Sequence, residues 1–186
     1  PNDWSTASLS KPAAPGNLKI GASDLGTGDS LSVSWSAPSG ATGYTVQLQC
    51  TTNSSYNQSK SVGGTSTSFI LNQPGTYRVQ VSAKNSAGSS SVVTSGNCVV
   101  HPNVTVTYKD YDGTVLKTQS VKYGGNSSNP LAPTREGYTF QGWSQDGKNL
   151  KKDTVITAQY KINTYTVKFV DYNGEQIGES QRVEHG

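Results

Sequence analysis

Apolar and polar residues alternate along three stretches in the first half of the chain. In residues 31–35, 44–50 and 77–83, every second position is Val, Leu, Tyr, Trp, Cys or Ala, and most intervening positions are polar. This period of two is typical of a strand with one buried face. Clusters of Gly, Pro, Asn and Ser between the stretches predict turns. The spacing of strands and turns predicts an antiparallel β-sandwich.

The second half contains an internal repeat. Residues 104–113 (VTVTYKDYDG) recur as residues 165–174 (YTVKFVDYNG), and residues 120–124 recur as residues 182–186 with one extra residue. The chain therefore holds one complete copy and the first half of a second. Residues 104–110 and 114–123 predict a hairpin turning at Tyr-Asp-Gly, and Tyr138, Phe140 and Ile156 are expected to cover it.

Composition supports an all-β protein of two small domains. The 186 residues are 32% hydrophobic and 15% charged, and Ser, Thr, Gly and Asn fill much of the remainder, which suits short strands joined by polar turns. Residues 1–10 have no clear period and predict a tail or linker. A sandwich is expected over 11–101, a repeat module over 102–163 and half of a second module over 164–186.

The charge pattern argues against nucleic-acid binding. The net charge is +3, and Lys148, Lys151 and Lys152 stand beside Asp146 and Asp153, so we interpret these lysines as a solvated loop. No apolar run exceeds three residues, so no membrane span is expected in this segment.

Residues of the first half resemble the fibronectin type III domain across residues 12–100. The matching stretches are the proline-led 12–18, the strand 31–38 with its tryptophan, and 71–79. The last resembles the tyrosine-corner segment. The resemblance implies core roles for Trp35, Leu71 and Tyr77, and burial of a ring whose hydroxyl returns to backbone is physically consistent with that role. No Arg-Gly-Asp tripeptide is present.

Residues 104–163 resemble the internalin-type B repeat, also called the Listeria–Bacteroides repeat, of bacterial surface proteins. The matching motifs are the 110–113 turn, residues 133–143 and residues 154–160. The resemblance implies a small β-grasp-like module strung in tandem, with Trp143 as a structural residue. It also places the chain in a Gram-positive bacterium, at the cell surface or secreted.

Site chemistry is sparse. The chain has two histidines and two cysteines, and neither His101 nor His185 has a neighbour at metal-ligand spacing. No nucleophile elbow accompanies a usable histidine. Asp110, Asp112 and Gly113 could begin a calcium loop, but a strand resumes directly afterwards, which favours a hairpin turn. We therefore expect no catalytic residue, metal or cofactor.

Cys50 and Cys98 leave two alternatives open. An exported protein makes a disulfide plausible. However, the two predicted strands should run parallel with another between them, and two spacings of about 4.8 Å exceed the usual Cα reach of about 4.4–6.8 Å. The other alternative is a pair of buried thiols.

Three functions are compatible with the sequence. The first is a structural stalk or adhesion spacer of a modular surface or secreted protein. The second is an accessory spacer or carbohydrate-contacting region of a secreted polysaccharide-active enzyme. In the third, exposed aromatics contact an unknown protein or glycan, with Tyr111 and Tyr172 at equivalent hairpin tips as candidates. The alternative for these tyrosines is turn packing between neighbouring modules of the chain.

Overall fold

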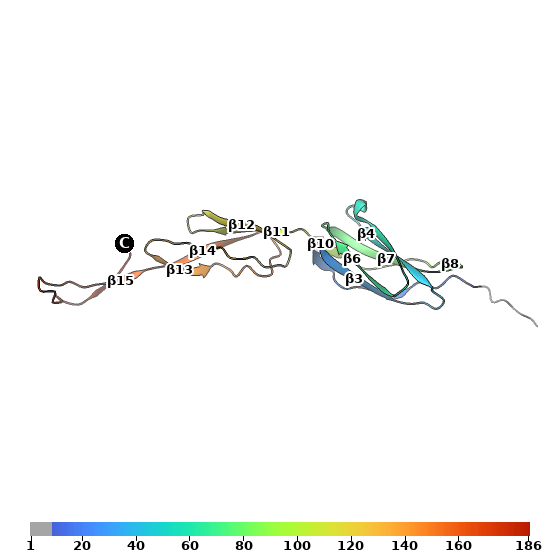
Figure 1. The fold of residues 1–186 in the computed structure, drawn as a ribbon, viewed down its shortest axis with the longest axis horizontal. Coiled ribbons are helices and arrows are strands. Elements are labelled where there is room, and N and C mark those ends of the chain that lie inside the picture. Colours follow the sequence, from blue (N-terminus) through green and yellow to red (C-terminus); the bar gives the residue numbers. More distant parts are fainter. Residues whose placement is uncertain (1–8) are drawn as a thin grey trace, which may run out of the picture. The chain divides into compact units, whose positions relative to one another are not determined.

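The computed structural model describes residues 9–186, so residues 1–8 of the predicted tail lie outside the described residues. These residues divide into two compact units, one ending at Asn103 and one running from Val104 to Gly186 (Figure 1). Residues 9–186 form strands and one short 3₁₀ helix, η1 (Ser54–Tyr56). The prediction of an all-β protein is therefore confirmed.

The first unit is a sandwich of two sheets. One sheet has the order β1-β3-β6, and the other has the order β2-β10-β7-β4-β5, with β8 and β9 also pairing with β7. The strands are β1 (Gly16–Ile20), β2 (Asp24–Gly26), β3 (Asp29–Ser36), β4 (Gly43–Cys50), β5 (Gln58–Val62), β6 (Ser66–Leu71), β7 (Gly75–Asn85), β8 (Gly88–Ser89), β9 (Val93–Thr94) and β10 (Cys98–His101).

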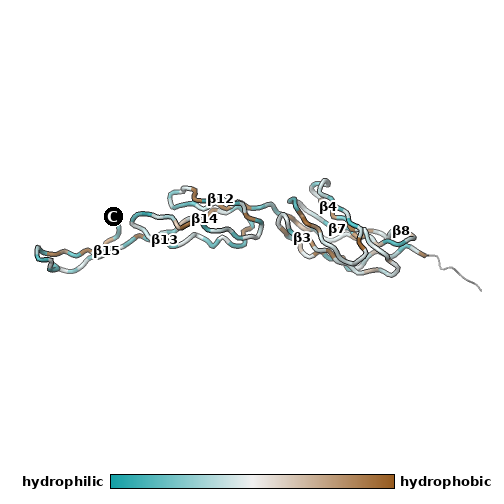
Figure 2. Tube along the Cα trace, in the orientation of Figure 1, coloured by the Kyte–Doolittle hydropathy of each residue, from teal (hydrophilic) through white to brown (hydrophobic). Residues whose placement is uncertain are grey.

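The predicted alternation forms the core of this sandwich. On β3, β4 and β7, the apolar set of each strand is buried and faces the opposite sheet. In Figure 2 the apolar stretches fall mainly within strands such as β3, whereas the connecting loops are largely hydrophilic. Phe69 and Leu71 of β6 are each 1% exposed and complete the core from the second sheet. Burying these faces is the main stabilising contribution to the unit.

The second unit contains one complete four-stranded module. Its sheet has the order β12-β11-β14-β13, in which β11 and β14 are parallel and the outer pairs are antiparallel. The strands are β11 (Val104–Lys109), β12 (Val115–Val121), β13 (Tyr138–Trp143) and β14 (Thr154–Ile162). The predicted hairpin is thus β11–β12. The strand order agrees with a β-grasp-like module, although residues 122–137 between β12 and β13 form no helix.

Irregular segments cover this sheet and complete a small core. The core is built on Val106, Tyr108 and Ile156, which are all 0% exposed. The Tyr108 hydroxyl lies 2.7 Å from Ser127 Oγ and 2.9 Å from Asn129 Oδ1, which fixes the crossing segment over the sheet.

A single residue, Asn163, separates the last strand of the complete copy from the first strand of the second copy. Residues 164–186 form a two-stranded sheet of β15 (Thr164–Val167) and β16 (Gln181–Glu184). Asn163 joins β14 to β15: its N–H donates to the Gly137 carbonyl at 2.8 Å, and its carbonyl accepts from the His185 N–H at 2.9 Å. The half copy is therefore hydrogen-bonded to the complete one. A lone hairpin is marginal in water, so this attachment contributes to its order.

Candidate interaction surfaces

Trp35, Leu71 and Tyr77 all lie in the core of the sandwich. The Tyr77 ring is 2% exposed, and its hydroxyl donates to the Gln73 carbonyl at 2.9 Å, four residues upstream. This is the local bond of a tyrosine corner. Trp35 packs edge-on against Tyr44, with ring centroids 5.2 Å apart. These side chains hold the two sheets together and are not available to a ligand.

We expect the sandwich to lose stability between about pH 10 and about pH 12. Burial first, and then the neighbouring Cys50 thiolate, raise the pKa of Tyr77 from 10.0 to about 12. A raised folded-state pKa gives stability that is complete below the unfolded pKa and is lost as pH rises through the folded pKa. Denaturant unfolding from pH 9 to 12 measures this.

The substitution Tyr77→Phe should flatten that pH dependence, whereas Tyr165→Phe in the second unit should leave it as in the parent chain. A Tyr77→Phe protein with an undiminished fall in stability would contradict the assignment.

The two cysteines lie on either side of the same tyrosine. Cys50 of β4 and Cys98 of β10 are both register partners of Tyr77 on β7, so they are two strand spacings apart. Two spacings of about 4.8 Å exceed the usual disulfide reach. Both side chains are buried free thiols. Their geometry favours the thiol alternative over the bridge.

A thiol assay should find two free thiols in denaturant without reductant, and slow reaction of both in the folded protein. Burial raises the pKa of Cys98, which is 0% exposed. Burial also acts on Cys50, but hydrogen bonds led by that of Thr52 outweigh it and lower its pKa. Since the thiolate is the reactive form, Cys50 should be modified before Cys98. No titratable thiol in denaturant, with full recovery after reduction, would establish a bridge.

In the repeat, Tyr111 belongs to a cluster built around Arg135. The guanidinium lies 3.9 Å from the Tyr111 ring centroid and 3.5 Å from that of Tyr138. Tyr160 meets Tyr111 edge-on at 5.9 Å, and its hydroxyl donates to Asp110 at 2.7 Å. Burial and then this carboxylate raise the pKa of Tyr160 to about 12. The cluster ties the hairpin tip to β13 and β14, although Tyr111 is still 53% exposed.

Tyr172 at the equivalent position is 96% exposed. The positions equivalent to Arg135 and Tyr160 would follow Gly186 and are outside this sequence. The same difference affects the other matched positions: Tyr108 is 0% exposed and its counterpart Phe169 is 55% exposed. Tyr172 is therefore exposed together with other matched residues of the half copy. The structure does not bring Tyr111 and Tyr172 together.

The carboxylates of the hairpin tip accept hydrogen bonds from backbone N–H groups of the same turn. Asp110 Oδ1 accepts from the Tyr111 N–H, and Asp112 Oδ1 accepts from the Thr114 N–H, each at 2.8 Å. This second bond holds the pKa of Asp112 below its usual value. Over residues 9–186, no three His, Cys, Asp or Glu side chains gather as metal ligands. This geometry favours the hairpin turn over a calcium loop.

Trp143 lies on the covered face of the repeat sheet. Its ring packs edge-on against Tyr108, with centroids 5.0 Å apart, and against Phe140 at 5.4 Å. Together with Tyr160, these rings form a continuous aromatic row across the module. Tyr108 is buried and the other three rings are half-buried, which is consistent with the structural role expected for Trp143.

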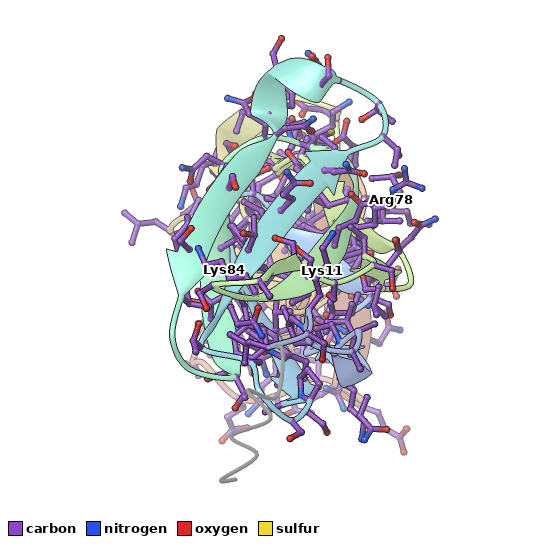
Figure 3. The ribbon with its side chains drawn as sticks, turned by 90° about the vertical axis from the view of Figure 1, so that its right-hand side faces the viewer. Lys11, Arg78 and Lys84 are labelled. Carbon is purple, nitrogen blue, oxygen red and sulfur yellow. The ribbon has the colours of Figure 1, made fainter. Side chains whose placement is uncertain are left out.

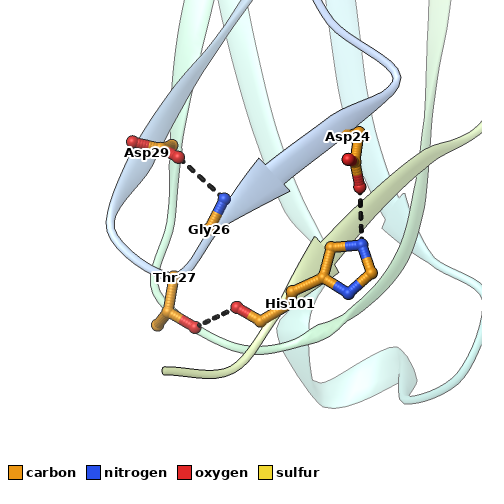
Figure 4. Close-up of polar contacts among 5 residues, drawn as sticks. All are labelled: Asp24, Gly26, Thr27, Asp29 and His101. Atoms are coloured by element: carbon orange, nitrogen blue, oxygen red, sulfur yellow. Dashed lines mark hydrogen bonds and ion pairs between the residues drawn. The ribbon is translucent and has the colours of Figure 1, made fainter. Parts of the chain in front are cut away.

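His101 is the last residue of strand β10. Its Nε2 is 2.5 Å from Asp24 Oδ1, and its carbonyl accepts from the Thr27 hydroxyl at 2.9 Å (Figure 4). Asp29 accepts from the Gly26 N–H in the same turn. The 77-residue separation of His101 and Asp24 hides this pairing from sequence patterns. It fixes the last strand against β2.

Two family models match the chain. The fibronectin type III domain matches residues 13–96, and the Listeria-Bacteroides repeat domain matches residues 105–163. In the described part of the chain, no helix is both long and apolar enough to cross a membrane.

Parts of larger bacterial proteins are similar in sequence to this chain. Internalin H of Listeria monocytogenes serovar 1/2a is 38% identical over 125 residues, which is 59% of this chain and 21% of that protein. Two Evansella cellulosilytica proteins whose names class them as membrane proteins are 28% and 32% identical over 92 and 91 residues. The chain spans 10–21% of the length of these three relatives.

Solved structures match about half of the chain. The fn3 domain of the human collagen alpha-1(XX) chain is 30% identical, with a TM-score of 0.41, covering 52% of this chain and 93% of that domain. The FN3tt structure is 19% identical, with a TM-score of 0.40, covering 50% and 97%.

Proposed function

Because residues 13–96 are a fibronectin type III domain and residues 105–163 a Listeria–Bacteroides repeat of a modular surface protein, we propose that this segment is a non-catalytic spacer and adhesion region. The parent protein would lie at the cell surface or be secreted. The relative in Listeria supports this setting. Any activity of the whole protein is proposed to reside outside these two modules.

The joint at Asn163 is the observation that carries this proposal. The sandwich and the complete repeat each have a core of their own, and Asn163, the one residue between β14 and β15, is hydrogen-bonded to both copies of the repeat. The Thr139 hydroxyl also donates to Asn163 Oδ1 at 2.6 Å. Each further repeat joined in this way adds a similar length to the chain, and a spacer requires such a regular increase in length.

A replacement experiment in the full-length protein tests the proposal. Residues 13–163 are exchanged for an unrelated folded spacer of similar length, and surface display and attachment to host material are measured beside a simple deletion. If the segment is only a spacer, the replacement restores what the deletion loses. If it is adhesive, display returns but attachment does not. Loss of a hydrolytic activity in both variants would instead favour an accessory segment of an enzyme.

A further inference from the structure

We propose that the outer face of the β5–β4–β7–β9 sheet binds an acidic polysaccharide through Arg78, Lys84 and the glutamine side chains between them. The proposal deepens the adhesive part of the proposed function, on which it rests for its biological setting. It is argued from the charge, hydrogen bonds and hollows of the first unit alone.

Charge is segregated within the sandwich. Over residues 9–103, five side chains are Lys or Arg, and the acidic ones are Asp24 and Asp29. Asp24 begins β2 and pairs with His101, and Asp29 begins β3 and accepts from the Gly26 N–H. Asp24 stands beside Val99 at the β10 side of the larger sheet, whereas strands β5, β4, β7 and β9 carry no carboxylate that would repel an anion. Electrostatic complementarity selects polyanions for such a face.

The cations mark two ends of this face. Arg78 and Lys84 are six residues apart on β7, which corresponds to about 20 Å at the rise of an extended strand. Lys11 lies near Lys84, because its side chain crosses Gly88 of β8, and β8 pairs with Lys84 and Asn85 (Figure 3). This spacing exceeds the size of one sugar and suits an oligosaccharide that carries carboxylates.

A chain of hydrogen bonds orders the polar side chains between the cations. Arg78 Nε donates to Gln49 Oε1 at 3.1 Å, Gln49 Nε2 donates to Gln80 Oε1 at 2.8 Å, and Gln80 Nε2 donates to Thr94 Oγ1 at 3.3 Å. The first bond fixes the guanidinium plane, which favours two-point binding of a carboxylate. Each glutamine amide also keeps further donor or acceptor capacity for sugar hydroxyls.

Two shallow hollows flank Gln47 in the middle of the face. One of about 220 Å³ is lined by Gln47, Gln49, Asn57, Gln58 and Ser59 together with Leu48. The other, of about 100 Å³, is lined by Thr45, Gln47, Gln80, Ser82 and Val92. Amide and hydroxyl groups predominate in both. They provide recesses for sugar rings at positions where hydrogen bonds are available.

The same face is poorly suited to nucleic acid or to a protein partner. Trp35, Tyr44, Phe69 and Tyr77 are buried in the core, so they offer no stacking platform for bases. Protein interfaces have an apolar centre, whereas the centre of this face is polar.

The test is retardation of the whole chain in native gels cast with polygalacturonate, beside gels with neutral dextran. We expect retardation by polygalacturonate alone, weakening with salt. The double variant Arg78→Ser/Lys84→Ser should bind at least about tenfold more weakly, which corresponds to about 1.4 kcal/mol lost over the two contacts together. The charge-matched control Lys19→Ser/Lys148→Ser, on the other sheet and in the repeat, should bind as the parent chain does.

Competition with polyglutamate separates sugar recognition from charge. Gln47→Ala/Gln80→Ala should weaken binding to polygalacturonate and leave binding to polyglutamate unchanged. The proposal is overturned if polygalacturonate does not bind, if both charge variants lose binding equally, or if polyglutamate competes as well as polygalacturonate. Tighter binding of a single-stranded oligonucleotide of equal charge would assign the face to nucleic acid. These outcomes do not depend on the replacement experiment, so either proposal can fail alone.

Discussion

Replacing Tyr108 by alanine should unfold the repeat and leave the fibronectin type III domain folded. Tyr108 is 0% exposed, packs against Trp143 and anchors the crossing segment through Ser127 and Asn129. Removing a buried aromatic side chain costs about 3–5 kcal/mol. A module of about 60 residues has a total stability of roughly 3–9 kcal/mol. The loss is therefore comparable with the stability of the whole module.

Amide hydrogen exchange resolved by residue measures this effect. Strands β11–β14 should lose protection, while β3, β4 and β7 keep theirs. Tyr108→Phe should cost only about 1–2 kcal/mol, since it removes hydrogen bonds and keeps the ring. Tyr172→Ala, at a ring that is 96% exposed, is the surface control. Loss of protection in both units together would show that their folding is coupled, contrary to this expectation.

Replacing Trp35 by alanine should destabilise the sandwich to a similar extent. The side chain is 5% exposed and contacts Tyr44 across the core, so we expect a loss of about 3–5 kcal/mol in the free energy of unfolding. Denaturant unfolding followed by circular dichroism measures it.

Trp35→Phe should be much milder than the alanine variant. The indole Nε1 is buried, and it has no hydrogen-bond partner among the residues that the structure describes. The phenylalanine variant therefore loses ring volume but no hydrogen bond, and it removes an unsatisfied donor. A cost for Trp35→Phe equal to that of Trp35→Ala would show that the nitrogen has a partner in solution.

The sequence predicts the strands whose period matches their burial. On β3, β4 and β7 every second residue is apolar, and these are the residues that the sandwich buries. The hairpin β11–β12 was predictable for a further reason: the repeat shows its turn twice, as Tyr-Asp-Gly and as Tyr-Asn-Gly. Local pattern and fold agree at these elements.

Long-range contacts of irregular segments were not predictable. Arg135 lies outside any strand, so no period indicates that its guanidinium would stack between Tyr111 and Tyr138. The last strand of the sandwich is also divided into β8, β9 and β10, because residues 88–97 are rich in Ser and Gly and carry no alternation. The polar face around Gln47 is formed by residues of three strands, so it can be recognised only when the register of these strands is known.

The order of strands in the repeat has a mechanical consequence. The first strand, β11, and the last, β14, are parallel neighbours, paired from Val106 with Thr154 to Lys109 with Thr157. A pull on the two ends of the module drags these strands in opposite directions along their length. The hydrogen bonds between them are then loaded together in shear, instead of being opened one by one. Tension on the chain is thus borne by the innermost pair of the sheet, and the module resists extension along the direction in which successive repeats are joined.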